Sequence, residues 1–250
     1  MKFLPKISLN FSFSFKKLFK NFFLFLAGLT LGAFLFMPWE VAWSQAFKLA
    51  DAKISKASIQ WGDFISAGPF SFEVTNVNVK TRKGLTITVP QLGVSLGFSP
   101  LVEVRVNTGP TLTARLFQTK SLTFGGGVDI SKLVQMEGLG GKVRITADVG
   151  FPNWGAPPHT GSLLVHSDMV EIPGGMTAED VSVNAILAGQ QFQLNSFSCG
   201  QPIPVTAKGS ATLDWKQLPN SSYNITGTTT FGETERQFSK SGKLSKFINF

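Results

Sequence analysis

The chain has 250 residues, of which 43% are hydrophobic and only 15% are charged. Soluble proteins carry roughly 25% charged residues, so this composition argues against a disordered chain and against an ordinary cytosolic enzyme. Two histidines and one cysteine are too few for a Cys/His zinc centre, an intramolecular disulfide or a CxxC redox site. We therefore expect a protein that is not an enzyme, with no catalytic residue, no cofactor and no metal ligand.

The net charge of +8 is concentrated at the two ends of the chain. The first 20 residues contain five lysines and no acid, and three more lysines lie at positions 240, 243 and 246. The other basic residues are balanced by the 15 acidic ones. A nucleic-acid binder needs lysine and arginine clustered on its folded body, so the charge pattern predicts no nucleic-acid partner.

The segment from Asn21 to Trp39 contains no charged residue. A helix of this length spans roughly 28 Å, which is close to the hydrocarbon thickness of a bilayer. The sequence therefore predicts a basic cytoplasmic tail over 1–20 and a transmembrane helix over 21–39. The side chains expected to anchor it are Phe22, Phe23, Leu24, Phe25, Leu26, Leu29, Leu31, Phe34, Leu35, Phe36 and Trp39.

The residues on either side of this segment predict its orientation. Lys16, Lys17 and Lys20 precede it, and lysines remain on the cytoplasmic side of a membrane. We thus expect a single-pass protein of the bacterial inner membrane, with a cytoplasmic N-terminus and a periplasmic main domain. A cleaved signal peptide is the alternative. The length of the apolar segment, and the bulk of Trp43 and Phe47 near the cleavage site, favour a retained anchor.

Beyond the anchor, residues 40–58 show apolar positions at helical spacing and are expected to form a helical linker. The periodicity then changes to two. Val205, Ala207, Gly209, Ala211, Leu213 and Trp215 alternate with polar residues, and such alternation is typical of a strand with one buried face. Residues 142–149 repeat the pattern. A β domain is therefore expected over 59–240, followed by a basic tail over 241–250.

Turn residues separate these segments every 8–15 positions, which predicts 11 to 13 strands. Among the turns we count the glycine runs Gly125–Gly127 and Gly138–Gly141. Residues 150–159 contain three prolines and should be irregular, and 129–137 should form a short helix capped by Asp129. The predicted fold is mainly β: one N-terminal transmembrane helix followed by a curved, mostly antiparallel, multi-stranded periplasmic sheet.

Candidate catalytic groups are few. His166 is followed by Ser167 and Asp168, but neighbouring residues of a strand point to opposite faces, so His166 cannot activate Ser167. The glycine runs are not followed by the Lys-Ser/Thr pair and helix that a phosphate loop needs. Cys199 lies beside a glycine and is expected to be an inert thiol.

The order of features along the chain resembles type II secretion system protein N (the GspN family), in its form with a single anchor and a periplasmic β domain. The resemblance covers residues 22–240 and is carried by short motifs: Pro38–Trp43, Ser58–Trp61, Ala67–Phe70, Ser99–Leu101, Thr108–Pro110, Gly140–Gly141, Gly161–Leu163, Ile172–Gly175 and Lys208–Leu213. It implies an accessory inner-membrane component of the apparatus that moves folded proteins across the outer membrane. It defines no catalytic residue.

Two functions follow as expectations. In the first, the β domain is a non-enzymatic assembly module of the secretion apparatus, whose partners are its other inner-membrane components and whose strand edges recruit them. In the second, the sheet is a trough that binds or transfers lipid, as in larger AsmA-like envelope proteins, and acyl chains are its ligand. A scaffold should fill its inner face with its own side chains, whereas a carrier should leave a continuous apolar groove.

Overall fold

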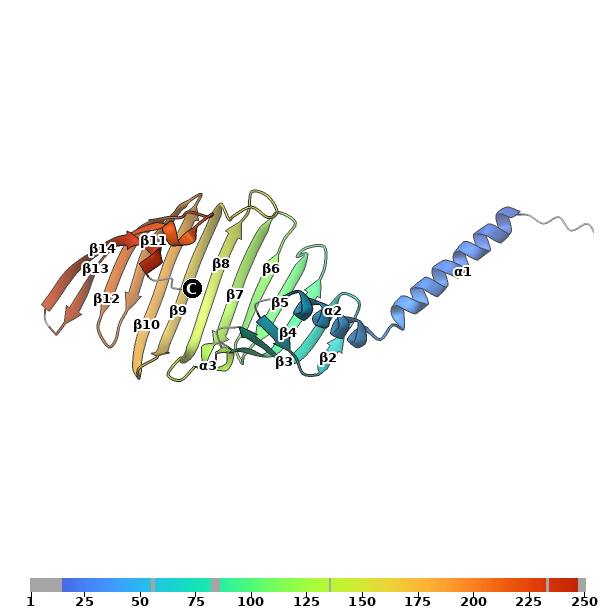
Figure 1. Cartoon of the computed structure of the whole chain (residues 1–250), viewed down its shortest axis with the longest axis horizontal. Coiled ribbons are helices and arrows are strands. Elements are labelled where there is room, and N and C mark those ends of the chain that lie inside the picture. Colours follow the sequence, from blue (N-terminus) through green and yellow to red (C-terminus); the bar gives the residue numbers. More distant parts are fainter. Residues whose placement is uncertain (1–14, 55–56, 82–85, 135, 233, 247–250) are drawn as a thin grey trace, which may run out of the picture. The chain divides into compact units, whose positions relative to one another are not determined.

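The computed structural model describes residues 15–54, 57–81, 86–134, 136–232 and 234–246 (Figure 1). The chain divides into two units, one up to Trp39 and one from Glu40 onwards. The first unit contains one long helix, α1 (Phe15–Leu35). It begins within the predicted tail and ends before Trp39, which is half-buried. Most of the expected anchor side chains are exposed, namely Phe22, Phe23, Leu24, Phe25, Leu26, Leu29, Leu31, Phe34 and Phe36.

No single helix of the described residues is both long and apolar enough to cross a membrane. The segments Phe22–Phe34 and Trp39–Lys53 satisfy the criteria of length and composition only together, as a bent pair. The side chains of Lys16, Lys17, Lys20 and Leu35 lie outside the described part of the chain.

The second unit contains one antiparallel sheet of 14 strands, preceded by helix α2 (Trp39–Lys53). A short helix, α3 (Ile130–Leu133), and two 3-10 turns, η1 (Leu218–Asn220) and η2 (Leu244–Lys246), interrupt or end the sheet. The strands are β1 (Ala57–Gln60), β2 (Phe64–Ala67), β3 (Ser71–Thr81), β4 (Thr86–Leu96), β5 (Val102–Asn107), β6 (Thr111–Leu116), β7 (Ser121–Asp129), β8 (Gly140–Gly150), β9 (Thr160–Ile172), β10 (Met176–Ala188), β11 (Gln191–Cys199), β12 (Val205–Thr212), β13 (Ser222–Phe231) and β14 (Thr234–Lys243).

From β3 onwards each strand pairs with the strand that precedes it and the strand that follows it in the chain (Figure 1). β1 and β2 both pair with β3, and β14 ends the order of described strands, so the sheet does not close on itself. The expectation of a mainly β, antiparallel domain is confirmed. The expected count of 11 to 13 strands is too low.

Strand β4 contains Pro90, and proline cannot donate a ladder hydrogen bond. The structure runs β4 straight through it, with pairs Val77–Val89 and Thr75–Gln91 on either side. Asn76, which lies opposite Pro90, adopts a left-handed backbone with φ of 50°. The backbone of the partner strand β3 thus changes its conformation at Asn76, and the pairing continues on both sides of Pro90.

The glycine runs were expected to form turns, and for Gly125–Gly127 this expectation is wrong. These three residues lie inside β7 and pair with residues of β6 and β8. A Cβ atom on Gly126 would overlap the carbonyl oxygen of Thr111, so glycine is needed there for the close approach of β6 rather than for a reversal of the chain. In the second run Gly138 does lie in a turn, with φ of 74°, whereas Gly140–Gly141 begin β8.

Several boundaries also differ from those expected. α2 ends at Lys53 and β1 begins at Ala57, within the range assigned to the helical linker. At the other end, β14 continues to Lys243, within the range assigned to the basic tail. Residues 151–159 are irregular as predicted, and Asp129 caps α3 by accepting a hydrogen bond from the Ser131 backbone N–H at 3.2 Å.

The main core of the sheet lies where α2 packs on β3. Phe72, Val74 and Val77 are buried there, and Trp43 and Phe47 of α2 pack against them. The centroids of the Phe47 and Phe72 rings are 5.3 Å apart in an edge-to-face arrangement, which aromatic pairs prefer. The Trp43 indole N–H donates to the Gly68 carbonyl at 2.8 Å, which fixes the helix on the sheet.

We predict that Phe47→Ala lowers the free energy of unfolding by about 2 kcal/mol, because the truncated ring leaves a half-empty site between α2 and β3. Leu49→Ala, on the same helix, is the control, since its side chain is 64% exposed and should change stability by less than about 0.5 kcal/mol. Denaturant unfolding of the full-length chain, followed by tryptophan fluorescence, measures both. Equal losses would contradict the packing of α2 on the sheet.

Candidate functional site

One face of the sheet carries an uninterrupted line of apolar residues from β3 to β13. Residues directly opposite each other on paired strands share a face, so the register connects them. We call this line the cross-strand row: Phe72, Val94, Val104, Ala114, Phe124, Ala147, Leu163, Ala185, Leu194, Gly209 and Ile225.

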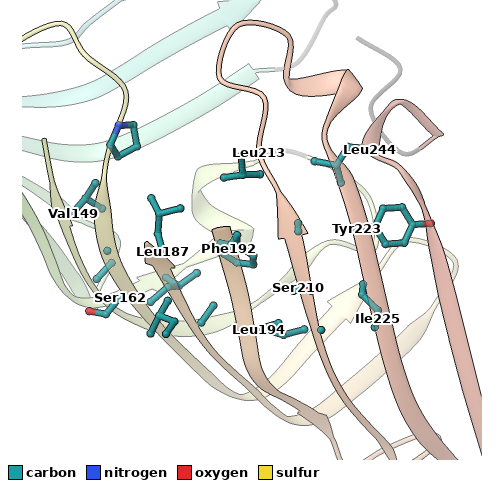
Figure 2. Close-up of a pocket in the computed structure, with 18 of the residues that line it drawn as sticks. Val149, Ser162, Leu187, Phe192, Leu194, Ser210, Leu213, Tyr223, Ile225 and Leu244 are labelled. Atoms are coloured by element: carbon teal, nitrogen blue, oxygen red, sulfur yellow. The ribbon is translucent and has the colours of Figure 1, made fainter. Parts of the chain in front are cut away.

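The C-terminal half of this face is hollowed into a groove of about 740 Å³. Figure 2 shows its side chains projecting from neighbouring strands into a common space. Its lining is almost entirely apolar and runs from β8 to β13, with members of the row joined by further side chains of the same strands and the loops that follow them: Val149, Leu187, Phe192, Leu213, Trp215 and Tyr223. The volume falls within the roughly 300–1,000 Å³ typical of small-molecule sites.

Small residues keep the groove open. Ala185, Gly209 and Ala211 lie on its floor, between the larger side chains of their neighbours. A Cβ on Gly209 would overlap the carbonyl oxygen of Asn224, so the strands approach too closely for a larger residue. The alternation expected for residues 205–212 is confirmed, with alternate residues half-buried and exposed.

The end of β12 differs from the sequence prediction. The strand was expected to reach Trp215, with Leu213 and Trp215 buried and Asp214 exposed. It stops at Thr212, because the Asp214 carboxylate accepts hydrogen bonds from the backbone N–H groups of Lys216 and Gln217 and turns the chain. Leu213, Asp214 and Trp215 are all half-buried. Leu213 and Trp215, with Pro158 and Leu244, therefore form the rim of the groove.

The opposite face of the sheet carries pairs of polar and charged side chains. Glu103 lies between two arginines, with oxygen–nitrogen distances of 3.6 Å to Arg105 and 2.7 Å to Arg115, and Arg105 also reaches Glu73 at 3.6 Å. Further along, the hydroxyls of Thr206 and Thr228 lie 2.9 Å apart across β12 and β13. These pairs are open to solvent and contribute little stability individually. Their position makes this the solvent face of the sheet.

The histidine and serine that could suggest a hydrolase are kept apart. His166 is exposed and lies 3.1 Å from the exposed carboxylate of Asp168. Ser167 is 2% exposed, and its hydroxyl donates to the carbonyl of Lys142 at 2.7 Å, with the carbonyl of Met169 as second acceptor at 3.0 Å. The hydroxyl thus holds β9 to β8 where their register shifts, and it does not contact the imidazole.

The other candidates from the sequence also have local roles. The Cys199 thiol is half-buried and points to the Gln201 carbonyl at 3.1 Å. Neither glycine run is followed by a long helix. The helix that lies between the two runs, α3, has only four residues. No group of three or more His, Cys, Asp or Glu side chains that could hold a metal ion occurs among the described residues. The apolar groove is therefore the candidate site.

Comparisons with protein-family models, with curated proteins and with solved structures give no match for this chain.

The sequence predicted the residues of the groove only in part. Period-two alternation placed Ala147, Val149, Gly209 and Ala211 on inner faces. It could not show which strands lie next to one another, nor that α2 covers only the N-terminal part of the row. The open half of the face is a property of this pairing and of the helix position.

Ser167→Ala should lower the free energy of unfolding by about 1–3 kcal/mol, the usual effect of leaving a buried polar group without its hydrogen-bond partner. His166→Ala, one residue away on the exposed face, should change it by less than about 0.5 kcal/mol. Thermal or denaturant unfolding of the two full-length variants tests the difference. A His166 variant as unstable as the Ser167 variant would contradict this assignment.

Proposed function

We propose that this protein is a non-enzymatic lipid-binding or lipid-transfer protein of the bacterial envelope, and that the groove over β8–β13 holds acyl chains. The observation that carries the proposal is the cross-strand row, which continues as an apolar floor over β8–β13, beyond the part of the sheet on which Trp43 and Phe47 of α2 pack. An acyl chain matches such a site because it is long, flexible and without polar groups along its length.

The N-terminal end of the row supports this reading by contrast. There α2 lays Trp43 and Phe47 over Phe72, and the side chains of the protein itself fill the apolar face. In a scaffold, the side chains of the protein itself would be expected to fill the whole inner face. At Leu194, Gly209 and Ile225 the same face is only half-buried, and a space of about 740 Å³ remains.

The energetics are adequate for binding. Removal of each methylene from water is worth roughly 0.8 kcal/mol, so ten methylenes in the groove would contribute about 8 kcal/mol before the loss of chain and translational freedom is subtracted. The gain and this loss are of the same order, so an acyl chain in the groove would be held weakly and reversibly. A transfer protein must release its ligand, so a groove of this kind suits that task.

The proposed location is the inner membrane, with the N-terminus in the cytoplasm and the sheet in the periplasm. The lysines before Asn21, and the uncharged segment up to Trp39, support this orientation. A tethered groove would remain close to a supply of lipid.

Photocrosslinking in cells tests the groove with the full chain in its own membrane. A benzophenone amino acid in place of Phe192, which lines the groove, should yield covalent lipid adducts that mass spectrometry detects. The same residue in place of Gln193 is the matched control, because Gln193 is the next residue of β11 and lies on the exposed face. We expect at least tenfold more lipid adduct at position 192.

The contrast between the two positions decides the result. Equal adduct at 192 and 193 would indicate only proximity to the bilayer, and absence of adduct at 192 would contradict lipid binding. Ala211→Asp, which places a charge on the floor of the groove, should abolish the adduct at 192, whereas Thr212→Asp on the outer face should leave it.

A second candidate function is assembly into a type II secretion apparatus. The open edge of the sheet favours it, since β14 offers ten residues at the end of the strand order and a partner strand can add to such an edge. The partners would be other inner-membrane components of the apparatus. The motif pattern that resembles protein N of this system supports the same candidate.

A clean deletion strain separates the two candidates. Loss of a secretion component should leave folded exoproteins in the periplasm, with little effect on the permeability of the envelope. Loss of a lipid carrier should weaken the envelope while exoprotein release stays normal. Fractionation of exoproteins, together with a dye-uptake assay, measures both outcomes in one strain.

A further inference from the structure

The cross-strand row ends on a charged residue. At β14 the residue directly opposite Ile225 is Lys240, so this lysine lies on the groove face of the last strand. Cross-strand partners have Cβ atoms about 5 Å apart, and Ile225 lines the groove. The lysine is exposed. Its flexible stem can therefore place the ammonium group over the open side of the groove.

The surroundings of Lys240 leave its charge unbalanced. The inward residues of β13 that pair beside it are Tyr223, Ile225 and Gly227, none of which is charged. Glu235, the acid of β14 that the structure describes, has the opposite parity along the strand and lies on the other face. Within residues 15–54, 57–81, 86–134, 136–232 and 234–246, no ion pair involves Lys240.

We propose that Lys240 binds the anionic headgroup, phosphate or carboxylate, of an amphiphile whose acyl chain lies in the groove. This inference rests on the proposed lipid-binding function and adds to it the charge and the direction of the ligand. The tail lies toward β8–β12, and the head lies at the β13–β14 edge. Arg236 shares the face of Lys240 but is four residues away, or roughly 13 Å along the strand, so of these two cations Lys240 is the one beside Ile225 of the groove lining.

A different role for an inward lysine on an edge strand is protection against pairing with another chain. The two roles predict different effects of the same substitution. A headgroup ligand affects which lipids bind, whereas a protective charge affects the state of association. The test therefore measures both quantities.

The experiment uses the full chain with the crosslinking residue at position 192, reconstituted in phosphatidylcholine vesicles. The vesicles contain equal amounts of phosphatidate, fatty acid and diacylglycerol with the same acyl chain. The ratio of anionic to neutral adducts is measured by mass spectrometry. We expect Lys240→Glu to lower this ratio about tenfold, and Lys240→Gln to lower it about threefold, as expected for loss of one partly exposed charge pair.

Lys243→Glu is the matched control, since it makes the same charge change on the same strand but on the outer face, opposite Ser222. It should keep the ratio within twofold of that of the unmodified protein, which removes the general attraction of the bilayer as an explanation. The adducts with phosphatidate and with fatty acid, quantified separately by mass, show whether phosphate or carboxylate is preferred.

Each outcome has one meaning. Adducts whose ratio is unchanged in Lys240→Glu overturn the headgroup site and leave the lipid groove standing. If the unmodified protein itself forms no adduct with any of the three lipids, the proposed lipid groove is overturned, and the headgroup site with it. An unchanged ratio accompanied by new dimers of Lys240→Glu in cross-linking assigns the lysine to protection of the edge.

Discussion

The structure depends on the register of an antiparallel sheet in which each strand pairs with its neighbours in the chain. Because side chains alternate between two faces, a shift of one residue in any pair would turn the apolar side of a strand to the solvent. The register connects Phe72 at one end to Ile225 at the other without a break. A single apolar face thus extends across the sheet, and the groove, its rim and its terminal lysine are all positions on that face.

The two ends of this face differ in what lies over them: α2 packs on one end, and the groove lies at the other. At β3, the aromatic residues of α2 bury it and form the main core. At β8–β13 small residues recess it, and the turn at Asp214 places Leu213 and Trp215 at its rim. The main core and the groove are thereby separated along one sheet, since the part that holds α2 to β3 is distant in the strand order from the part that forms the groove.

Much of this arrangement was predictable from local patterns, and the failures have physical reasons. Alternation along residues 142–149 and 205–212 gave the correct inner faces, because burial of one side of a strand is recorded directly in the sequence. Gly125–Gly127 misled, because glycine serves close contact between strands as well as turns. The sequence could not decide between a filled inner face and an open groove, since this depends on where α2 stops covering the row. The position of Lys240 on the groove face required the pairing of β13 with β14.

Nearly every strand is joined to its neighbour in the sheet by a short connection. The width of the apolar floor therefore depends on the number of hairpins in the chain. Insertion or loss of one hairpin would lengthen or shorten the apolar floor by two strands, about 10 Å at the usual spacing between strands, without disturbing the pairing of the others. Nearly every strand pairs only with its neighbours along the chain in such an arrangement, so the sheet can form progressively from one hairpin to the next. A family of proteins built in this way could adjust the size of its cargo by duplicating hairpins, while the helix-covered end of the sheet stays the same.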